Sequence, residues 1–154
     1  MNIYKRFKEG RISYPAAKKN LIDLWREVSP LDKSSIESAF KKVTLRDGAR
    51  EAVLYLKKKY RLVIISGAID MFVQVMSEKL GIQSWYASTK LKFDKDDYLY
   101  DFDYTLSRGE EKLGFFKDYC TKLKTSSPHC AAIGDGDSDM PIFSKVKYSI
   151  LFVA

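Results

Sequence analysis

The sequence predicts an α/β fold with a mostly parallel sheet, together with a smaller unit made only of helices. Two observations support this. The first 43 residues contain helical patterns and no strand pattern, whereas from Asp47 onward apolar runs alternate with amphipathic segments of helical spacing. Strands that alternate with helices are typical of a parallel sheet covered by helices. The 154 residues match the usual size of one domain, so we expect residues 1–43 to form the helical unit and residues 44–154 to form the α/β core.

Two helices are predicted in the first unit, after a short segment that ends at Gly10. A Ser-Tyr-Pro sequence at 13–15 suits a helix start, and apolar residues recur at helical spacing over 16–26. Ser29 and Pro30 are expected to end this helix. The second helix is expected over 32–42, with Ile36 and Phe40 on one side.

The core is predicted to alternate between helices and buried strands. The run 62–65 is apolar and β-branched throughout, which is typical of a strand covered on both faces. Gly81 is expected to end the helix over 70–80. The segment 85–104 alternates polar and apolar residues around a charged turn, and therefore predicts a surface hairpin. The expected helices cover 48–59, 70–80 and 110–123, and the expected buried strands cover 62–65, 130–133 and 148–153.

The composition excludes several classes of site. Two cysteines and one histidine are too few for a disulfide scaffold, a Cys/His zinc site or a motif with two histidines. No apolar run reaches the roughly 18 residues that a membrane helix needs, and the first residues contain no apolar signal segment. We therefore expect no membrane partner and a cytoplasmic location, with chemistry carried by carboxylates, hydroxyls and lysines.

The formal net charge of +7 raises the question of a nucleic-acid partner. The lysines are scattered, however, and the densest run, at 57–59, ends a predicted helix, where the helix dipole favours cations. No pattern of interleaved basic and aromatic residues accompanies it. We therefore expect no nucleic acid, and a basic field would equally attract a small phosphorylated substrate.

Two predicted strands end in polar turns that contain glycine, and ligands of open α/β sheets bind beyond the carboxyl ends of the strands. The first turn, at 66–68, offers the Ser66 hydroxyl and free backbone N–H groups at the start of a helix. This arrangement suits an anion such as phosphate. A structural alternative stays open, in which Ser66 only caps the helix.

The second turn, at 134–139, carries three carboxylates on one loop: Asp135, Asp137 and Asp139. Like charges this close repel each other, so a bound cation is expected, and hard oxygen ligands favour Mg²⁺. The alternative is a solvated turn rich in Asp and Gly.

Three segments together resemble motifs II, III and IV of the haloacid dehalogenase superfamily, namely 62–67 (LVIISG), 109–112 (GEEK) and 134–139 (GDGDSD). Lys112 follows Ser66 by 46 positions and precedes Asp135 by 23, which suits the phosphoserine phosphatase branch. Residues 9–13 and 44–48 resemble the helical cap of that branch and its junction to the core. The resemblance covers essentially the whole chain and implies a Rossmann-like core, with residues 1–43 as part of a cap.

The resemblance implies a phosphoryl-binding role for three residues. Ser66 and the Gly67 backbone would bind a phosphoryl oxygen. Lys112 would neutralise charge on the transferring phosphoryl group and on the nucleophile.

The resemblance also implies a Mg²⁺ site on the second turn. Asp135 would be the metal ligand, while Ser138 and Asp139 would support the metal and hold Lys112, so that Asp139 counts among the catalytic residues. The branch more often has Asn where this sequence has Ser138, and serine has a shorter hydrogen-bonding reach.

The nucleophile of the superfamily is the first Asp of an Asp-x-Asp-x-Thr motif, which precedes the cap in this branch. We therefore expect this Asp and its strand upstream of Met1, and further sequence after the last strand. The segment Asp101-x-Asp103-x-Thr105 matches the motif, but charged residues precede it instead of a buried strand. Only six residues separate it from Lys112. We expect Asp101 and Asp103 to lie on the surface hairpin and to take no part in catalysis.

The function expected from the resemblance is a Mg²⁺-dependent phosphomonoesterase that works through an aspartyl-phosphate intermediate. The alternative is a phosphate- or metal-binding remnant without turnover, and a polyanion binder is a third, weaker option. The expected partner is a small phosphorylated metabolite, and a homodimer stays open.

Overall fold

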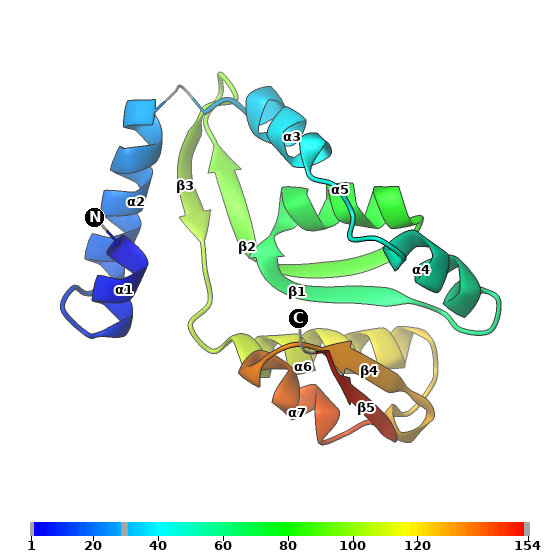
Figure 1. The fold of residues 1–154 in the computed structure, drawn as a ribbon. Helices are drawn as coiled ribbons and strands as arrows, with labels where there is room; N and C mark the ends of the chain where they lie inside the picture. The colour runs from blue at the N-terminus through cyan, green and yellow to red at the C-terminus, as the bar shows by residue number, and fades with distance from the viewer. Residues whose placement is uncertain (1, 29–30, 153–154) are drawn as a thin grey trace.

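The structure is a computed structural model that describes residues 2–28 and 31–152 (Figure 1). The helices are α1 (Ile3–Lys8), α2 (Tyr14–Val28), α3 (Lys33–Lys42), α4 (Ala49–Lys57), α5 (Asp70–Leu80), α6 (Arg108–Lys122) and α7 (Met140–Phe143). The strands are β1 (Val63–Ile69), β2 (Ser84–Phe93), β3 (Leu99–Asp103), β4 (Ala131–Gly134) and β5 (Tyr148–Leu151). Short 3-10 helices cover Ser127–His129 and Asp137–Asp139. The predicted α/β fold is confirmed.

The first sheet has the order β1-β2-β3. The first half of β2 runs parallel to β1, with Val63 opposite Ser84. Its second half pairs antiparallel with β3, with Lys92 opposite Asp101. The predicted hairpin therefore exists, but half of its first strand belongs to the parallel sheet, because a crossover through α5 returns the chain beside β1.

The second sheet consists of β4 and β5, which run parallel, with Ala131 opposite Tyr148. Among the described residues no ladder joins β1 to β4, and α6 packs against both. The buried cluster contains Leu113, Phe116, Cys120 and Ile142. Ile65 of β1 and Ala132 of β4 both pack against it, so α6 fixes the two sheets relative to each other.

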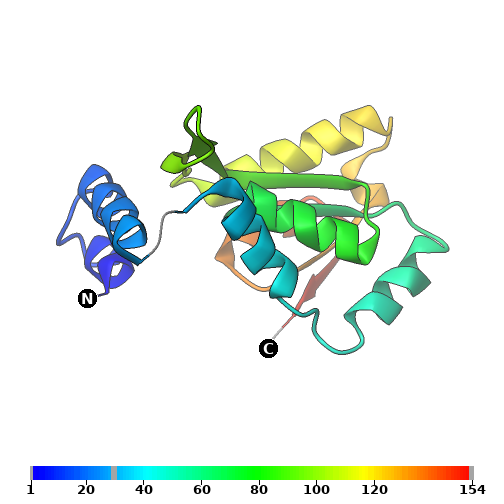
Figure 2. The ribbon, with the colours of Figure 1, turned by 90° about the horizontal axis from the view of Figure 1, so that it is seen from above.

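Helices α5 and α6 lie on opposite faces of the first sheet, as the two views show (Figures 1 and 2). Helix α3 packs on the outer side of α5, where the rings of Phe40 and Phe72 meet edge to face at 5.3 Å between centroids. The Lys79 ammonium of α5 donates to the carbonyl oxygens of Lys41 and Val43. These contacts attach the end of α3 to the core.

Helix α2 contacts the hairpin through β3. The rings of Trp25 and Phe102 lie 5.6 Å apart, and the Lys18 ammonium lies 2.7 Å from an Asp101 oxygen. The division of the chain at residue 43 stays a prediction. No helix of the described chain is long and apolar enough to cross a membrane.

Most element boundaries agree with the sequence pattern to within a few residues, and α5 begins and ends where predicted, with Gly81 left-handed at φ 64°. The prediction that the last two strands are buried is wrong for the described residues. Ile133 is 60% exposed and all of β5 is exposed. The buried cluster packs against this sheet at Ala132 of β4, and both faces of β5 are open among the described residues. Ser29, Pro30 and Val153 lie outside the described residues.

Candidate active site

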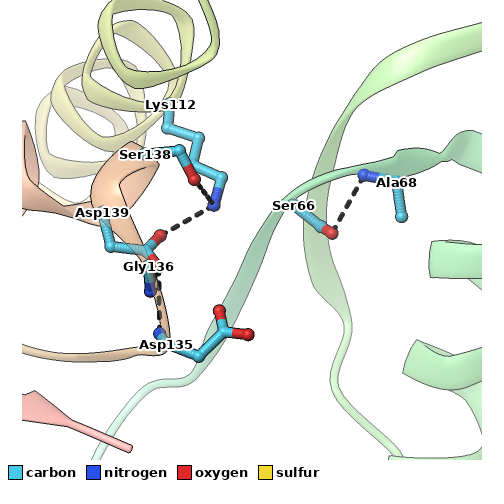
Figure 3. A network of polar contacts seen from close by, with 7 residues as sticks. All are labelled: Ser66, Ala68, Lys112, Asp135, Gly136, Ser138 and Asp139. Atoms are coloured by element: carbon cyan, nitrogen blue, oxygen red, sulfur yellow. Dashed lines mark hydrogen bonds and ion pairs between the residues drawn. The ribbon is translucent and has the colours of Figure 1, made fainter. Parts of the chain in front are cut away.

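The residues singled out in the sequence gather where β1, the loop after β4 and the first turns of α6 meet (Figure 3). Ser66 lies on β1, and Lys112 lies one turn into α6. Asp135, Ser138 and Asp139 follow β4. In Figure 3 the Lys112 ammonium and the Asp135 carboxylate lie on the same side of β1, and the Ser66 hydroxyl points toward the Ala68 N–H.

Lys112 is buried and held by two partners on the loop after β4. Its Nζ donates to Asp139 Oδ1 at 2.7 Å and to Ser138 Oγ at 2.9 Å. The two charged side chains are only 9% and 13% exposed. A buried charge is tolerated when it is paired and hydrogen-bonded, so Asp139 compensates Lys112. An ammonium has three N–H donors, and the third has no partner among the described residues.

The other oxygen of Asp139 shapes the loop. Oδ2 accepts hydrogen bonds from the backbone N–H groups of Asp135 and Gly136 at 3.1 and 3.3 Å. A Cβ on Gly134 would lie 2.5 Å from this carboxylate. Position 134 therefore has to be glycine for Asp139 to reach both Lys112 and the loop backbone.

The Ser66 turn differs from its prediction. Strand β1 continues through Ser66 and Gly67 to Ile69, with a register shift against β2, and α5 begins only at Asp70. Ser66 is therefore not the N-cap, and the capping alternative is wrong. Instead, Ser66 Oγ accepts from the Ala68 N–H at 3.1 Å, which leaves the hydroxyl hydrogen free to donate to a ligand. Thr89 Oγ1 donates to the Gly67 carbonyl at 3.0 Å and holds the turn.

The carboxylates of the second turn do not converge as expected. Asp139 faces inward to Lys112, while Asp135 and Asp137 are exposed. No group of three or more His, Cys, Asp or Glu side chains suited to a metal ion is found within the described residues. The carboxylates of Asp135 and Asp137 have no hydrogen bond or ion pair in that part of the chain. Figure 3 shows that the Asp135 carboxylate lies on the same side of β1 as the Lys112 ammonium, which suits a metal ligand at the site.

Asp101 and Asp103 lie on β3, as expected for a surface hairpin. Asp101 forms ion pairs with Lys18 and Lys92, and Asp103 forms one with Lys92 at 2.7 Å. The hydrogen bond from Lys18 lowers the pKa of Asp101 below its ordinary value. Both carboxylates thus form ion pairs with lysines of α2 or β2. Within β3, Leu99 and Phe102 are buried. That Asp101 and Asp103 take no part in catalysis stays a prediction.

The sequence reasoning missed Arg108, which lies beside the Ser66 turn. A Cβ on Gly67 would lie 3.4 Å from Arg108 Cδ, and the guanidinium carbon lies 4.5 Å from the centroid of the Tyr104 ring. A single arginine at a helix start has no sequence signal, because nothing in its neighbourhood shows that the chain folds back onto Gly67.

Comparison with known proteins gives a consistent result. Residues 3–144 match the family model of the haloacid dehalogenase-like hydrolases. The chain is 28% identical over 155 residues to a phosphoserine phosphatase of Methanocaldococcus jannaschii, and the match covers 99% of this chain and 71% of that protein.

Solved structures show the same fold. A phosphoserine phosphatase determined as a phospho-aspartyl intermediate analogue has a TM-score of 0.71 at 27% identity, with 99% of this chain and 71% of that chain covered. A hydrolase from Salmonella enterica has a TM-score of 0.74 at 21% identity, and the match covers 92% of this chain. The present chain spans 48% of that Salmonella protein. At this low sequence identity, the similarity shows a common fold and no more.

Proposed function

This chain belongs to the haloacid dehalogenase-like hydrolases, and from this premise we propose that it binds the phosphoryl group of small phosphate monoesters at Ser66, Gly67 and Lys112 and takes part in their Mg²⁺-dependent hydrolysis. The observation that carries the proposal is the position of Lys112. Its ammonium is fixed by Asp139 and Ser138, keeps one donor free, and lies beside the strand that carries Ser66.

Each residue has a definite task in this proposal. The Ser66 hydroxyl donates to one phosphoryl oxygen, and the backbone around Gly67 offers further N–H groups. Lys112 stabilises the negative charge that develops on the phosphoryl oxygens, because a fixed cation in a partly dry site needs no reorganisation during the reaction. Asp139 and Ser138 do not touch the substrate in this proposal; they position Lys112.

Asp135 would hold Mg²⁺. Its free, exposed carboxylate oxygen is the type of ligand that Mg²⁺ prefers, and this ion commonly binds through one or two carboxylates together with waters and phosphate oxygens. When bound there, the cation would draw negative charge from the phosphoryl group. The attacking carboxylate of the aspartyl-phosphate mechanism is not assigned to any described residue.

Calorimetry with inorganic phosphate, in the presence of Mg²⁺, tests the proposal. Wild type is expected to bind phosphate, and Ser66→Ala is expected to weaken binding by roughly tenfold, because a hydrogen bond to a charged group is lost. Ser77→Ala removes another buried hydroxyl, on α5, and is expected to bind as wild type does. Absence of phosphate binding by the folded wild type would contradict the proposal.

Turnover of 4-nitrophenyl phosphate separates the two candidate functions. Phosphate binding with Mg²⁺-dependent turnover supports the phosphatase. Phosphate binding without turnover favours the second candidate, a phosphate- or metal-binding protein. One observation favours this candidate: Asp101 and Asp103, which match the nucleophile motif, are paired with lysines.

A further inference from the structure

The two cysteines of the chain, Cys120 and Cys130, are free thiols that lie in contact with each other. Their sulfur atoms are 3.9 Å apart and share a hydrogen bond in which either thiol can donate. Cys120 lies in the last turn of α6, and Cys130 lies directly before β4. The contact therefore joins the helix that carries Lys112 to the strand that leads to Asp135.

The two thiols differ in how easily an external reagent reaches them. Cys120 is only 6% exposed and belongs to the buried cluster that α6 forms with the two sheets. Cys130 is partly exposed, and its thiol also donates to the Ser126 carbonyl at 3.5 Å. Burial raises the pKa of Cys120 to about 11. Since the thiolate is the nucleophile, a reagent in solution is expected to react with Cys130 first.

A bond between the two sulfur atoms requires a small local movement. A disulfide is about 2.0 Å long, so the sulfur atoms have to approach each other by roughly 1.9 Å. Cys120 is held within a helix of the core, whereas Cys130 follows the segment 121–129, in which no residue is buried. An exposed segment can adjust without loss of core packing. We therefore expect Cys130 to move toward α6 while the helix stays in place.

We propose that Cys120 and Cys130 form a reversible disulfide when the protein meets a small disulfide such as oxidised glutathione. The Cys130 thiolate attacks one sulfur of glutathione disulfide, the S–S bond of the reagent breaks, and one glutathione leaves. Cys120 then attacks the Cys130 sulfur, and its proton passes to the second glutathione as this leaves. Two protein thiols are oxidised, and one glutathione disulfide is reduced to two glutathione molecules.

The contact between the thiols favours the second step over a stable mixed disulfide. An attacking group already held beside its target reacts much faster than a second molecule from solution. The new bond would close a ring over residues 120–130 and would fasten the end of α6 to the start of β4. Lys112 lies eight positions before Cys120, or about 12 Å along the helix, so the bond forms away from the Lys112 ammonium. The inference does not depend on the proposed function.

Reaction of the folded, reduced protein with glutathione disulfide tests the inference, with intact-protein and peptide mass spectrometry after an acid quench. Wild type is expected to lose two hydrogen atoms and to join the peptides of Cys120 and Cys130, and dithiothreitol should reverse this. Cys120→Ala should stop at a glutathione adduct on Cys130, because the resolving thiol is absent. Cys130→Ala should react at least roughly tenfold more slowly than Cys120→Ala, because a buried thiol of high pKa remains.

Unfolding in urea shows which variants are folded and supplies two further measurements. The oxidised wild type should unfold at a higher urea concentration than the reduced form, because the bond constrains the unfolded chain. In denaturing urea, Cys120→Ala and Cys130→Ala should react at similar rates, which makes the fold the source of their difference.

The wild-type product decides the inference without any variant. A lasting glutathione adduct on Cys130, or a disulfide between two protein molecules, in place of the internal bond would show that the inference is wrong. Equal rates of the two folded variants would contradict the proposed order of attack. An oxidised form with an unchanged or lower urea midpoint would contradict the fastening of α6 to β4.

Discussion

The Asp139 carboxylate connects Lys112 to the backbone of the loop after β4. One oxygen accepts from the Lys112 ammonium at 2.7 Å, and the other accepts from the N–H groups of Asp135 and Gly136. The Asp139 side chain thus holds the Lys112 ammonium in position and also determines the path of the loop that carries Asp135. Changes at either end of this network are therefore expected to affect both stability and ligand binding.

Replacing Lys112 by methionine should destabilise the protein by about 3 kcal/mol, because removal of one partner leaves the other charge buried and unpaired. The double variant Lys112→Met with Asp139→Asn should recover part of this loss, since the buried charge is then absent. Unfolding in urea, followed by circular dichroism, measures the free energies. Lys122→Met breaks an exposed pair with Asp118 and should hardly change the midpoint. Equal effects of Lys112→Met and Lys122→Met would contradict this account.

Gly134→Ala should destabilise the protein by about 1 to 3 kcal/mol, the usual cost of adding a methyl group where no space exists. The added Cβ would meet the Asp139 carboxylate at 2.5 Å, so phosphate binding should weaken as well. Gly136→Ala is the control, because no atom lies within 4 Å of its Cβ position and its backbone is extended. Urea unfolding and phosphate calorimetry on both variants check the prediction, and identical behaviour of the two would refute it.

Asp135→Asn should lower the affinity for Mg²⁺ by roughly tenfold or more, because the amide replaces a charged oxygen ligand by a neutral one. Asp137→Asn removes the same charge from an exposed position two residues away and should cost much less. Titration calorimetry with MgCl₂ gives both affinities. If the two variants bind Mg²⁺ equally, the cation is attracted by the general charge of the loop and Asp135 is not its ligand.

Much of the candidate site could be predicted from the sequence, because short motifs in the right order fix which strand and helix ends carry polar residues. Ser66, Lys112 and Asp139 fall on such ends, and the structure brings Lys112 and Asp139 into contact. The crowding of carboxylates was not predicted correctly. Residue types show only how many charges a loop carries. The contact of Asp139 with a lysine 27 positions away in the chain was implied by the resemblance alone.

Other features depend on tertiary contacts that leave no trace in a local pattern. Ser66 looks like a helix cap because a polar turn precedes an amphipathic segment, yet β2 keeps the chain extended to Ile69. The apolar run of β5 indicates a buried strand, but burial depends on whether a helix covers it, and Ile150 is 51% exposed. The position of Arg108 beside Gly67 is a tertiary contact, which the sequence around Arg108 does not indicate.

The two free cysteines should differ in reactivity, although their sulfur atoms lie only 3.9 Å apart. Burial, together with the hydrogen bond between Cys120 and Cys130, raises the pKa of Cys120 to about 11. Since the thiolate is the reactive form, iodoacetamide at pH 8 should label the less buried Cys130 first. Peptide mass spectrometry over time measures both rates, and in denaturing urea the rates should become similar. Faster labelling of Cys120 in the native protein would contradict its burial.

Asp101→Asn should leave phosphate binding unchanged and should reduce stability at neutral pH by at most about 1 kcal/mol, because the pair with Lys18 is partly exposed.

The hydrogen bond from Lys18 lowers the pKa of Asp101. A carboxylate with a lowered pKa in the folded state stabilises the protein above its ordinary pKa, and this contribution disappears as the pH falls through the lowered value. The difference in unfolding free energy between wild type and Asp101→Asn should therefore be present at pH 7 and should shrink progressively below pH 4. Asp103→Asn, whose carboxylate is 56% exposed, should show a smaller difference. Urea unfolding across this pH range and phosphate calorimetry at pH 7 test both statements. Loss of phosphate binding in Asp101→Asn would show that this segment of β3 belongs to the site after all.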